Sequence, residues 1–182
     1  MTSDLTFITN EQGKTLKERF ETLIRDARFF DALVGYFYTS GFYAIYPALE
    51  KTEGIRILIG ISTSKQVHDL MTEARQAQQI EMIFSHAEAK AVVESQVAKE
   101  FEDSPDKREV EQGVTKFIEW VRNKKLEIKV YPSQDIHAKL YIVTFPEGDR
   151  DVGRVITGSS NLTQAGLVDN LEFNVEIGRA HV

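Results

Sequence analysis

The apolar positions of this chain switch between helical and strand spacing, and together they predict an α/β fold. Apolar side chains at positions 16, 20, 23, 24 and 27 follow the period of a helix, so we expect a helix within residues 13–27. Runs rich in β-branched and aromatic residues predict strands at 32–38, 55–61, 126–131, 136–145, 152–157 and 172–177, with a helix at 41–49. The nearly all-apolar run 55–61 favours a strand that is covered on both faces of its sheet.

A long charged stretch separates the early strands from the late ones. Residues 64–100 have helical spacing, and Ser104-Pro105-Asp106 interrupts the pattern before a second predicted helix at 107–124. This stretch is too long for a simple crossover between neighbouring strands. We therefore expect a helical insertion around residues 64–125, which is equally suited to form a dimer or to act as a solvated cover. At 182 residues, one domain covering 1–182 is the simplest organisation.

Composition narrows the classes of protein to consider. The chain has no cysteine, which excludes disulfides and thiolate metal sites. No apolar run approaches the ~20 residues of a membrane span, and no signal-like segment opens the chain, so we expect a cytoplasmic protein without membrane contact. A formal charge of −6 argues against a surface that binds nucleic acid everywhere. Any contact with DNA must therefore be local.

The late strands carry the polar residues that suggest chemistry. His137 and Lys139 alternate on the predicted strand 136–145, so their side chains share a face about 7 Å apart and can approach one anion. The next strand leads into Gly158-Ser159-Ser160-Asn161, in which Gly158 allows close approach of the backbone to a ligand and Ser159 and Asn161 offer hydrogen-bond donors. Such residues can handle a phosphodiester without a metal.

Two neighbouring segments add to this picture. Residues 162–167 predict one helical turn that ends at Gly166, with Ser160 or Asn161 as its N-cap, and a helix start favours a phosphate. The aromatic residues between 36 and 46 are expected to be mostly core. We expect at most one or two exposed rings there, with Tyr38–Ser40 near the site because loops at strand ends carry function.

These motifs resemble the phospholipase D superfamily, whose pattern is H-x-K, four residues, D, and then G-S-x-N. The segments HAK, GSSN and Asn170-Leu171-Glu172 match this pattern, whereas Thr144 stands at the Asp position. The resemblance is strongest over 136–177 and is closest to the single-motif, nuclease-like branch, including domains that precede helicase motors in bacterial proteins. It implies a mixed β-sheet flanked by helices. In this family the Asp serves the architecture of the site more than bond making, so Thr144 leaves retained catalysis open.

The resemblance also implies roles for individual residues. His137 would be the nucleophile that forms a phosphohistidine, and Glu172 would hold its other ring nitrogen. Lys139, Ser159 and Asn161 would bind the non-bridging phosphate oxygens. A second histidine is needed as general acid, and the chain has one such motif, so the resemblance implies a homodimer that pairs two copies of His137. No metal and no cofactor enter this scheme.

The favoured function is thus a hydrolase, namely a metal-independent DNA nuclease. The alternative is a non-catalytic phosphate or DNA-binding module of a helicase or restriction-type protein, suggested by Thr144. Lipid hydrolysis ranks lower because no membrane helix or basic amphipathic segment is evident. Since the sequence stops soon after the last predicted strand, we also expect an N-terminal fragment of a longer protein, with a helicase motor as one candidate for the downstream part.

Overall fold

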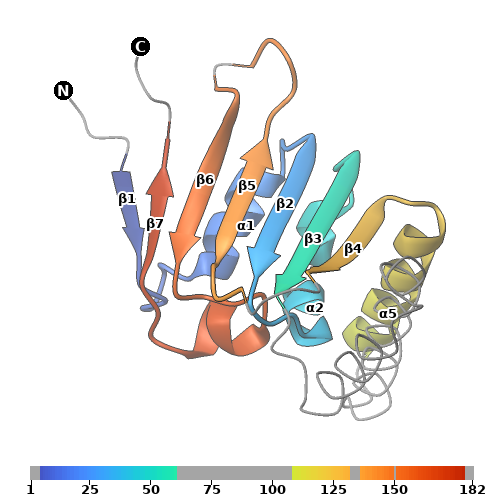
Figure 1. Cartoon of the computed structure of the whole chain (residues 1–182), viewed down its shortest axis with the longest axis horizontal. Helices are drawn as coiled ribbons and strands as arrows, with labels where there is room; N and C mark the ends of the chain where they lie inside the picture. Colours follow the sequence, from blue (N-terminus) through green and yellow to red (C-terminus); the bar gives the residue numbers. More distant parts are fainter. Residues whose placement is uncertain (1–4, 61–107, 132–135, 150, 179–182) are drawn as a thin grey trace, which may run out of the picture.

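The computed structural model describes residues 5–60, 108–131, 136–149 and 151–178 of the chain. The predicted helical stretch 64–100 and the break at 104–106 lie outside these residues. Within the described part, a seven-stranded mixed sheet has the order β1-β7-β6-β5-β2-β3-β4 (Figure 1). The strands are β1 (Leu5–Ile8), β2 (Phe29–Val34), β3 (Gly54–Gly60), β4 (Leu126–Tyr131), β5 (Leu140–Thr144), β6 (Gly153–Gly158) and β7 (Asn174–Ile177).

The helices of the described part are α1 (Leu16–Ile24), α2 (Thr39–Leu49), α5 (Arg108–Arg122) and the short π-helical η1 (Ala165–Asp169). Helix α1 begins where the sequence predicts a helix because Thr15 and Glu18 form a capping box: Thr15 Oγ1 accepts the Glu18 N–H, and the Glu18 carboxylate accepts the Thr15 N–H. Helix α5 confirms the second helix predicted at 107–124. Seen in Figure 1, α1 and α2 lie behind the sheet.

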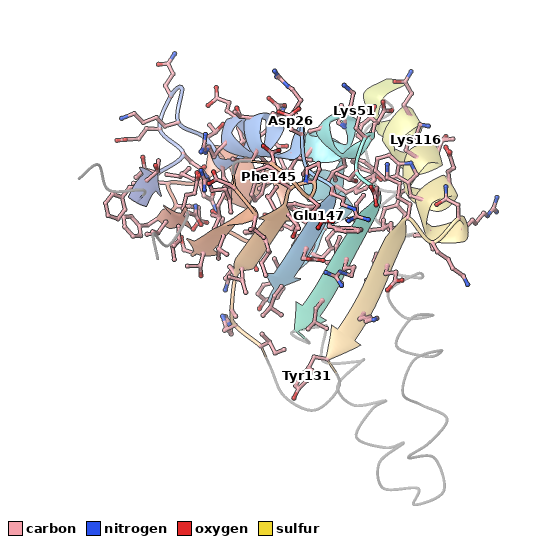
Figure 2. The ribbon with its side chains drawn as sticks, turned by 90° about the horizontal axis from the view of Figure 1, so that it is seen from above. Asp26, Lys51, Lys116, Tyr131, Phe145 and Glu147 are labelled. Carbon is pink, nitrogen blue, oxygen red and sulfur yellow. The ribbon has the colours of Figure 1, made fainter. Side chains whose placement is uncertain are left out.

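The two faces of the sheet differ in what covers them. The face toward the helices is buried, and its core centres on Tyr141, whose ring lies 4.9 Å from Phe20 of α1 and 6.3 Å from Phe30 of β2, centroid to centroid. In β3, Ile55, Ile57 and Ile59 are buried whereas Arg56 is exposed, so burial alternates. The prediction of a strand covered on both faces is therefore wrong for the described residues, since their helices gather on one side (Figure 2).

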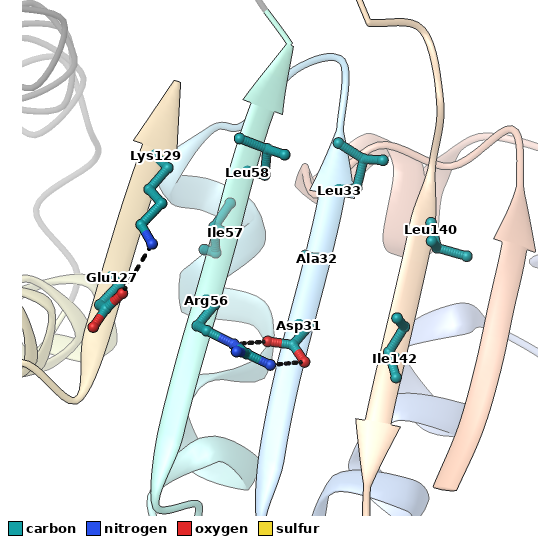
Figure 3. Close-up of a pocket in the computed structure, with 10 residues that line it drawn as sticks. All are labelled: Asp31, Ala32, Leu33, Arg56, Ile57, Leu58, Glu127, Lys129, Leu140 and Ile142. Carbon is teal, nitrogen blue, oxygen red and sulfur yellow. Dashed lines mark hydrogen bonds and ion pairs between the residues drawn. The ribbon is translucent and has the colours of Figure 1, made fainter. Parts of the chain in front are cut away.

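A shallow pocket lies on the face away from these helices. Its charged lining residues are paired: Arg56 Nη2 donates to Asp31 Oδ2 at 2.7 Å, and Lys129 Nζ lies 3.6 Å from Glu127 Oε2 (Figure 3). None of the residues that the sequence marks as candidate site residues lines this pocket. The site must be sought at another place on the sheet.

Several strand boundaries differ from the sequence prediction. Strand β1 is not predicted because only four residues alternate, and it forms only by pairing with β7. Strand β5 begins at Leu140 and not at Ile136. The reason is visible in the packing: a Cβ at Gly60 would lie 2.4 Å from the carbonyl oxygen of Ile136, and one at Gly35 would lie 3.1 Å from it. The segment before β5 therefore crosses the ends of β2 and β3 instead of pairing along them.

Candidate active site

Strand directions bring the three motif segments to one end of the sheet. Strand β5 is antiparallel to β6, and β6 is antiparallel to β7, so the start of β5, the end of β6 and the start of β7 are neighbours. His137 and Lys139 precede β5, Ser159 and Asn161 follow β6, and Glu172 precedes β7. Segments that are far apart in sequence thus meet in space.

The side chains of His137 and Lys139 touch each other. Lys139 Nζ lies 3.3 Å from His137 Nδ1 and donates to the His137 carbonyl oxygen at 2.9 Å. Neither residue lies in a strand, so the predicted alternation along a strand is wrong, although the two groups do meet. Because an ammonium only donates, Nδ1 can take part in this contact only as the acceptor. The imidazole is exposed, with its ring centroid 6.4 Å from that of Tyr36.

Asn161 joins this pair through the chain that follows β2. Its Oδ1 accepts the N–H of Tyr36 at 3.0 Å, so its Nδ2 donors point away from that peptide. A Cβ at Gly35 would lie 3.6 Å from Asn161 Oδ1 and 3.8 Å from Lys139 Nζ. An ammonium and an amide therefore come together over the same glycine, and only a residue without a side chain leaves the space between them open. We call Gly35, His137, Lys139, Ser159 and Asn161 the phosphate pocket, after the ligand that we propose for them below.

Ser159 and Glu172 form a separate pair at the start of β7. Ser159 Oγ donates a short hydrogen bond to Glu172 Oε2 and accepts the N–H of Phe173 at 2.9 Å, while the Ser159 N–H donates to the Phe173 carbonyl at 3.0 Å. In the described structure the hydrogen bond of this carboxylate therefore goes to Ser159 and not to His137. The predicted contact between Glu172 and the other ring nitrogen of His137 stays a prediction.

Gly158 has a structural role that the sequence did not predict. A Cβ at this position would lie 2.2 Å from the Phe173 carbonyl oxygen and 2.6 Å from Asn174 Cα. The glycine is therefore required for the close approach of the segment that enters β7, while its contact with a ligand stays a prediction.

A helical turn forms close to the predicted range 162–167, but its bounds differ, since it runs from Ala165 to Asp169 and does not end at Gly166. The helix η1 begins at Ala165 with Gln164 as N-cap, and Gly166 lies inside it, its N–H donating to Thr163 Oγ1 at 2.9 Å. Ser160 and Asn161 cannot cap it because their side chains bind elsewhere, Ser160 to Asn174 and Asn161 to Tyr36. The pocket is thus built from side chains and peptide groups, without a helix start.

The chain between β2 and α2 lies beside the motif, as predicted. The N–H of Tyr38 donates to the Leu162 carbonyl at 3.2 Å, and Ser40 Oγ accepts the N–H of Gln164 at 3.3 Å. Tyr38 is exposed and Phe42 is buried, which agrees with an aromatic cluster that is mostly core. The contributions of Gly35 and Tyr36 were not predicted, since a backbone N–H and a missing side chain leave no recognisable motif.

Thr144, which departs from the family pattern, lies away from the site. It ends β5, paired with Phe29 of β2 and Gly153 of β6, and its carbonyl accepts the N–H of Arg28 at 2.8 Å. It lies five positions after Lys139, which is roughly 16 Å along an extended chain. The substitution therefore removes no group from the phosphate pocket.

A buried tyrosine supports the loop that carries Ser159 and Asn161. Burial raises the pKa of the Tyr141 phenol, and the nearby Glu172 carboxylate raises it further, so the hydroxyl stays protonated at neutral pH. It donates to the Ser160 carbonyl at 2.8 Å. The sequence places Tyr141 in a strand core and gives no signal of this contact.

The part of the chain that the structure describes shows neither a metal site nor a membrane-spanning helix. Over residues 5–60, 108–131, 136–149 and 151–178, no three His, Asp or Glu side chains gather in a way that would hold a metal ion. No helix in this part of the chain is long and apolar enough to span a bilayer.

The chain is similar to known proteins in sequence and in structure. The family model described as cardiolipin synthase, PLD-like domain, matches residues 45–182, which is more than half of the chain. No curated protein matches the sequence. Similar solved structures include Nuc of Salmonella typhimurium, a phospholipase D family member (15% identity, TM-score 0.46, 96% of this chain and 82% of Nuc covered). NucT of Helicobacter pylori is similar as well (11% identity, TM-score 0.44, 94% and 83% covered).

A yeast tyrosyl-DNA phosphodiesterase is also similar (13% identity, TM-score 0.49), although the 98% of this chain that aligns spans 34% of the yeast protein. The match of the family model over residues 45–182 decides the assignment. The chain belongs to the phospholipase D-like domain family of the phospholipase D superfamily.

Proposed function

We propose that this chain is a metal-independent phosphodiesterase that cleaves DNA through a phosphohistidine on His137. The observation that carries the proposal is the convergence of Lys139 and Asn161 over Gly35, with the Lys139 ammonium 3.3 Å from the His137 imidazole. A cation, an amide and a histidine at this spacing can bind a phosphodiester and supply the group that attacks it. The phosphate pocket thus contains both the binding and the attacking groups.

The reaction follows from these groups in two steps. A nitrogen of His137 attacks phosphorus, so that a P–N bond forms and the P–O bond to one DNA fragment breaks. Water then attacks the phosphohistidine and passes a proton to the group that protonated the leaving oxygen, which breaks the P–N bond and frees the imidazole. Lys139, Ser159 and Asn161 bind the non-bridging oxygens, where donors already in place stabilise the transition state most. Binding of phosphate would draw the Lys139 ammonium from His137 Nδ1 to an oxygen and release that nitrogen.

The leaving oxygen of the first step needs a proton from a second group. His137 is the single histidine among the described residues. We therefore propose that a second copy of the chain supplies its own His137 as general acid, across a symmetric interface that joins two pockets into one site.

A non-catalytic DNA-binding module, such as a helicase or restriction-type protein would carry, is the second candidate. The observation that favours it is the hydrogen bonding of the pocket: Lys139 occupies His137 Nδ1, and Glu172 binds Ser159. Such a pocket can hold a phosphate while its histidine is not set for attack. This candidate predicts salt-dependent DNA binding without product.

The deciding experiment measures cleavage of labelled single- and double-stranded DNA in excess EDTA by the wild type, His137→Ala and Lys139→Met. Lys129→Met is the matched control. Lys129 is an exposed lysine on β4 beside Glu127, and it lines the shallow pocket of Figure 3 and not the phosphate pocket. We expect cleavage by the wild type and Lys129→Met alone. Full DNA binding without product in the wild type would favour the binding module.

The paired-histidine site has its own test. Wild-type and His137→Ala chains are mixed in equal amounts, allowed to exchange subunits, and assayed for cleavage. If each site needs two copies of His137, activity falls to about a quarter of that of the same total amount of wild-type protein, since mixed dimers are inactive. A fall to about half would show that each chain works alone.

A further inference from the structure

Ser160 stands at the variable position of the GSSN motif, yet all of its polar groups are bound. Its N–H donates to Asn174 Oδ1 at 3.3 Å, its Oγ accepts from Asn174 Nδ2 at 2.8 Å, and its carbonyl accepts from the Tyr141 hydroxyl at 2.8 Å. Ser160, Asn174 and Tyr141 are all 0% exposed. Because each polar atom of this buried residue has a hydrogen-bond partner, a shift of Ser160 would leave a buried donor or acceptor unsatisfied, and the residue is therefore fixed in place.

The residues on either side of Ser160, namely Ser159 and Asn161, are the two hydrogen-bond donors of the motif that we propose for the phosphate. Ser159 Oγ binds the Glu172 carboxylate, and Asn161 Oδ1 binds the Tyr36 N–H. The side chain of Ser160 is buried while those of Ser159 and Asn161 are not, so the loop alternates like an extended strand. Fixing Ser160 therefore fixes the direction in which both neighbours point.

The partners of Ser160 are themselves held firmly. The Tyr141 ring packs edge-on against Phe20 at 4.9 Å and beside Phe30 at 6.3 Å. Asn174 begins β7, two residues after Glu172, and pairs with Gly158 in the sheet. A rigid ring and a strand residue thus meet at one loop position.

We propose that Tyr141 and Asn174 are positioning residues of the candidate reaction, which act through Ser160 to aim Ser159 and Asn161 at the phosphate. This inference rests on the proposed function for its catalytic readout. Neither residue touches the substrate. Their effect is to preorganise the two donors, so that little reorientation is needed as charge develops on the phosphate oxygens. Loss of either contact loosens the donors and lowers the rate of the chemical step more than it weakens binding.

Thr52 provides a matched control for a purely structural role. Its side chain is buried, and its Oγ1 donates to a backbone carbonyl, that of Leu49, at 2.8 Å, the same length as the bond from Tyr141 to Ser160. Thr52 precedes β3, whose other end approaches the pocket at Gly60. Thr52→Val and Tyr141→Phe therefore each remove one buried hydroxyl donor, one far from the pocket and one beneath it.

The experiment compares Tyr141→Phe, Ser160→Ala and Thr52→Val for urea unfolding and for kcat and KM of DNA cleavage in EDTA. We expect similar losses of stability for Tyr141→Phe and Thr52→Val. Only Tyr141→Phe should lower kcat, by about tenfold or more, with a smaller change in KM. Ser160→Ala should shift kcat in the same direction, and it serves in place of Tyr141→Phe if that variant does not fold. Equal kcat for the two hydroxyl variants would overturn the proposal.

Amide hydrogen exchange separates this inference from the proposed function. We expect faster exchange over residues 159–162 in Tyr141→Phe, whereas Thr52→Val leaves that segment as in the wild type, whether or not the chain cleaves DNA. If the wild type does not cleave DNA and Tyr141→Phe still shows this local loosening, the nuclease proposal fails, and the positioning role is kept for phosphate binding. Unchanged exchange in Tyr141→Phe would defeat the positioning role by itself.

Discussion

Strand β7 buries two polar side chains two residues apart on the same face, and they have different partners. Asn174 binds Ser160, in the loop that carries the candidate donors. Glu176 is 3% exposed, and its Oε1 accepts from Arg19 Nη2 of α1 at 2.6 Å and lies 3.5 Å from Arg154 Nε of β6. The first contact joins the strand to the site, and the second joins it to a helix and a neighbouring strand.

The difference between the two contacts lies in what each fixes. Glu176 neutralises two guanidinium groups, and its hydrogen bonds raise the pKa of Arg19. Its removal would leave Arg19 without its anion, which is a cost to the whole fold. Asn174 carries no charge and fixes one loop, so its loss should be felt more in activity than in stability. Buried polar groups of similar exposure therefore serve architecture or function according to the element they hold.

The largest expected effect on stability comes from Glu176→Gln. The amide keeps the shape of the side chain but leaves Arg19 without its anion, while Arg154 keeps its ion pair with Asp151. We expect a loss of about 3 kcal/mol in the free energy of unfolding, measured in urea. Glu53→Gln is the control, because Glu53 accepts from Arg28 Nε at 2.8 Å with a side chain that is 59% exposed. The control should cost about 0.5 kcal/mol or less. Equal costs would show that burial of Glu176 does not matter.

Asn174→Ala should give the next largest loss of stability and a larger loss of activity. Removing the amide leaves the N–H and Oγ of Ser160 without partners, for which we expect about 2 kcal/mol. Cleavage per folded molecule should fall further than in Glu176→Gln. Normalised kcat values in the opposite order would contradict the division of roles between the two residues.

Gly35→Ala should affect the phosphate pocket with little effect on folding. The added methyl lies 3.1 Å from the Ile136 carbonyl and fills space beside Asn161 Oδ1 and Lys139 Nζ. We expect a stability change of about 1 kcal/mol or less and a loss of activity of about tenfold. Gly54→Ala is the control, since its Cβ would meet Phe29 Cδ1 at a similar 3.3 Å at the start of β3. Full activity in Gly35→Ala would place the phosphate elsewhere.

The smallest expected effect concerns the exposed capping-box contact between Thr15 and Glu18. The hydrogen bonds from Thr15, the backbone N–H first, lower the pKa of Glu18 from its ordinary value of 4.5. The unfolded chain therefore takes up this proton first as pH falls. The contribution of the capping box is present above about pH 4.5 and is lost as pH falls through the lower folded value. Glu18→Gln should slightly flatten the acid side of the Tm profile, and an unchanged profile would contradict this role.

The sequence was most informative where the signal is local. The helical spacing that begins at Leu16 predicts α1, and a helix is also predicted where α5 forms. The motif residues are recognisable because their types and spacing are specific to the family. Strand β1 was not predicted because four residues make a weak pattern. The start of β5 was predicted too early because the strand-like run 136–145 begins at Ile136, four positions before the pairing begins at Leu140.

The contacts that shape the site could not be predicted in this way. Asn161 depends on the N–H of Tyr36, which is 125 positions away in the chain, and Ser160 depends on Tyr141 and Asn174. None of these partners differs in type from an ordinary core or loop residue. The contact of Gly158 with the carbonyl of Phe173 was not predicted, because the two become adjacent only when β6 and β7 pair.

The sequence by itself determined which chemical groups are present: one H-x-K pair, one GSSN segment and a carboxylate, in a chain whose apolar pattern builds a mixed sheet. Residue identity and local spacing are sufficient for that, since they act within a few positions of the chain. Only the tertiary structure decided that the Lys139 ammonium meets the imidazole, that Glu172 binds Ser159, and that Thr144 lies far from both. The physical reason is that hydrogen bonds form between neighbours in space, and strand pairing, not sequence distance, makes these residues neighbours.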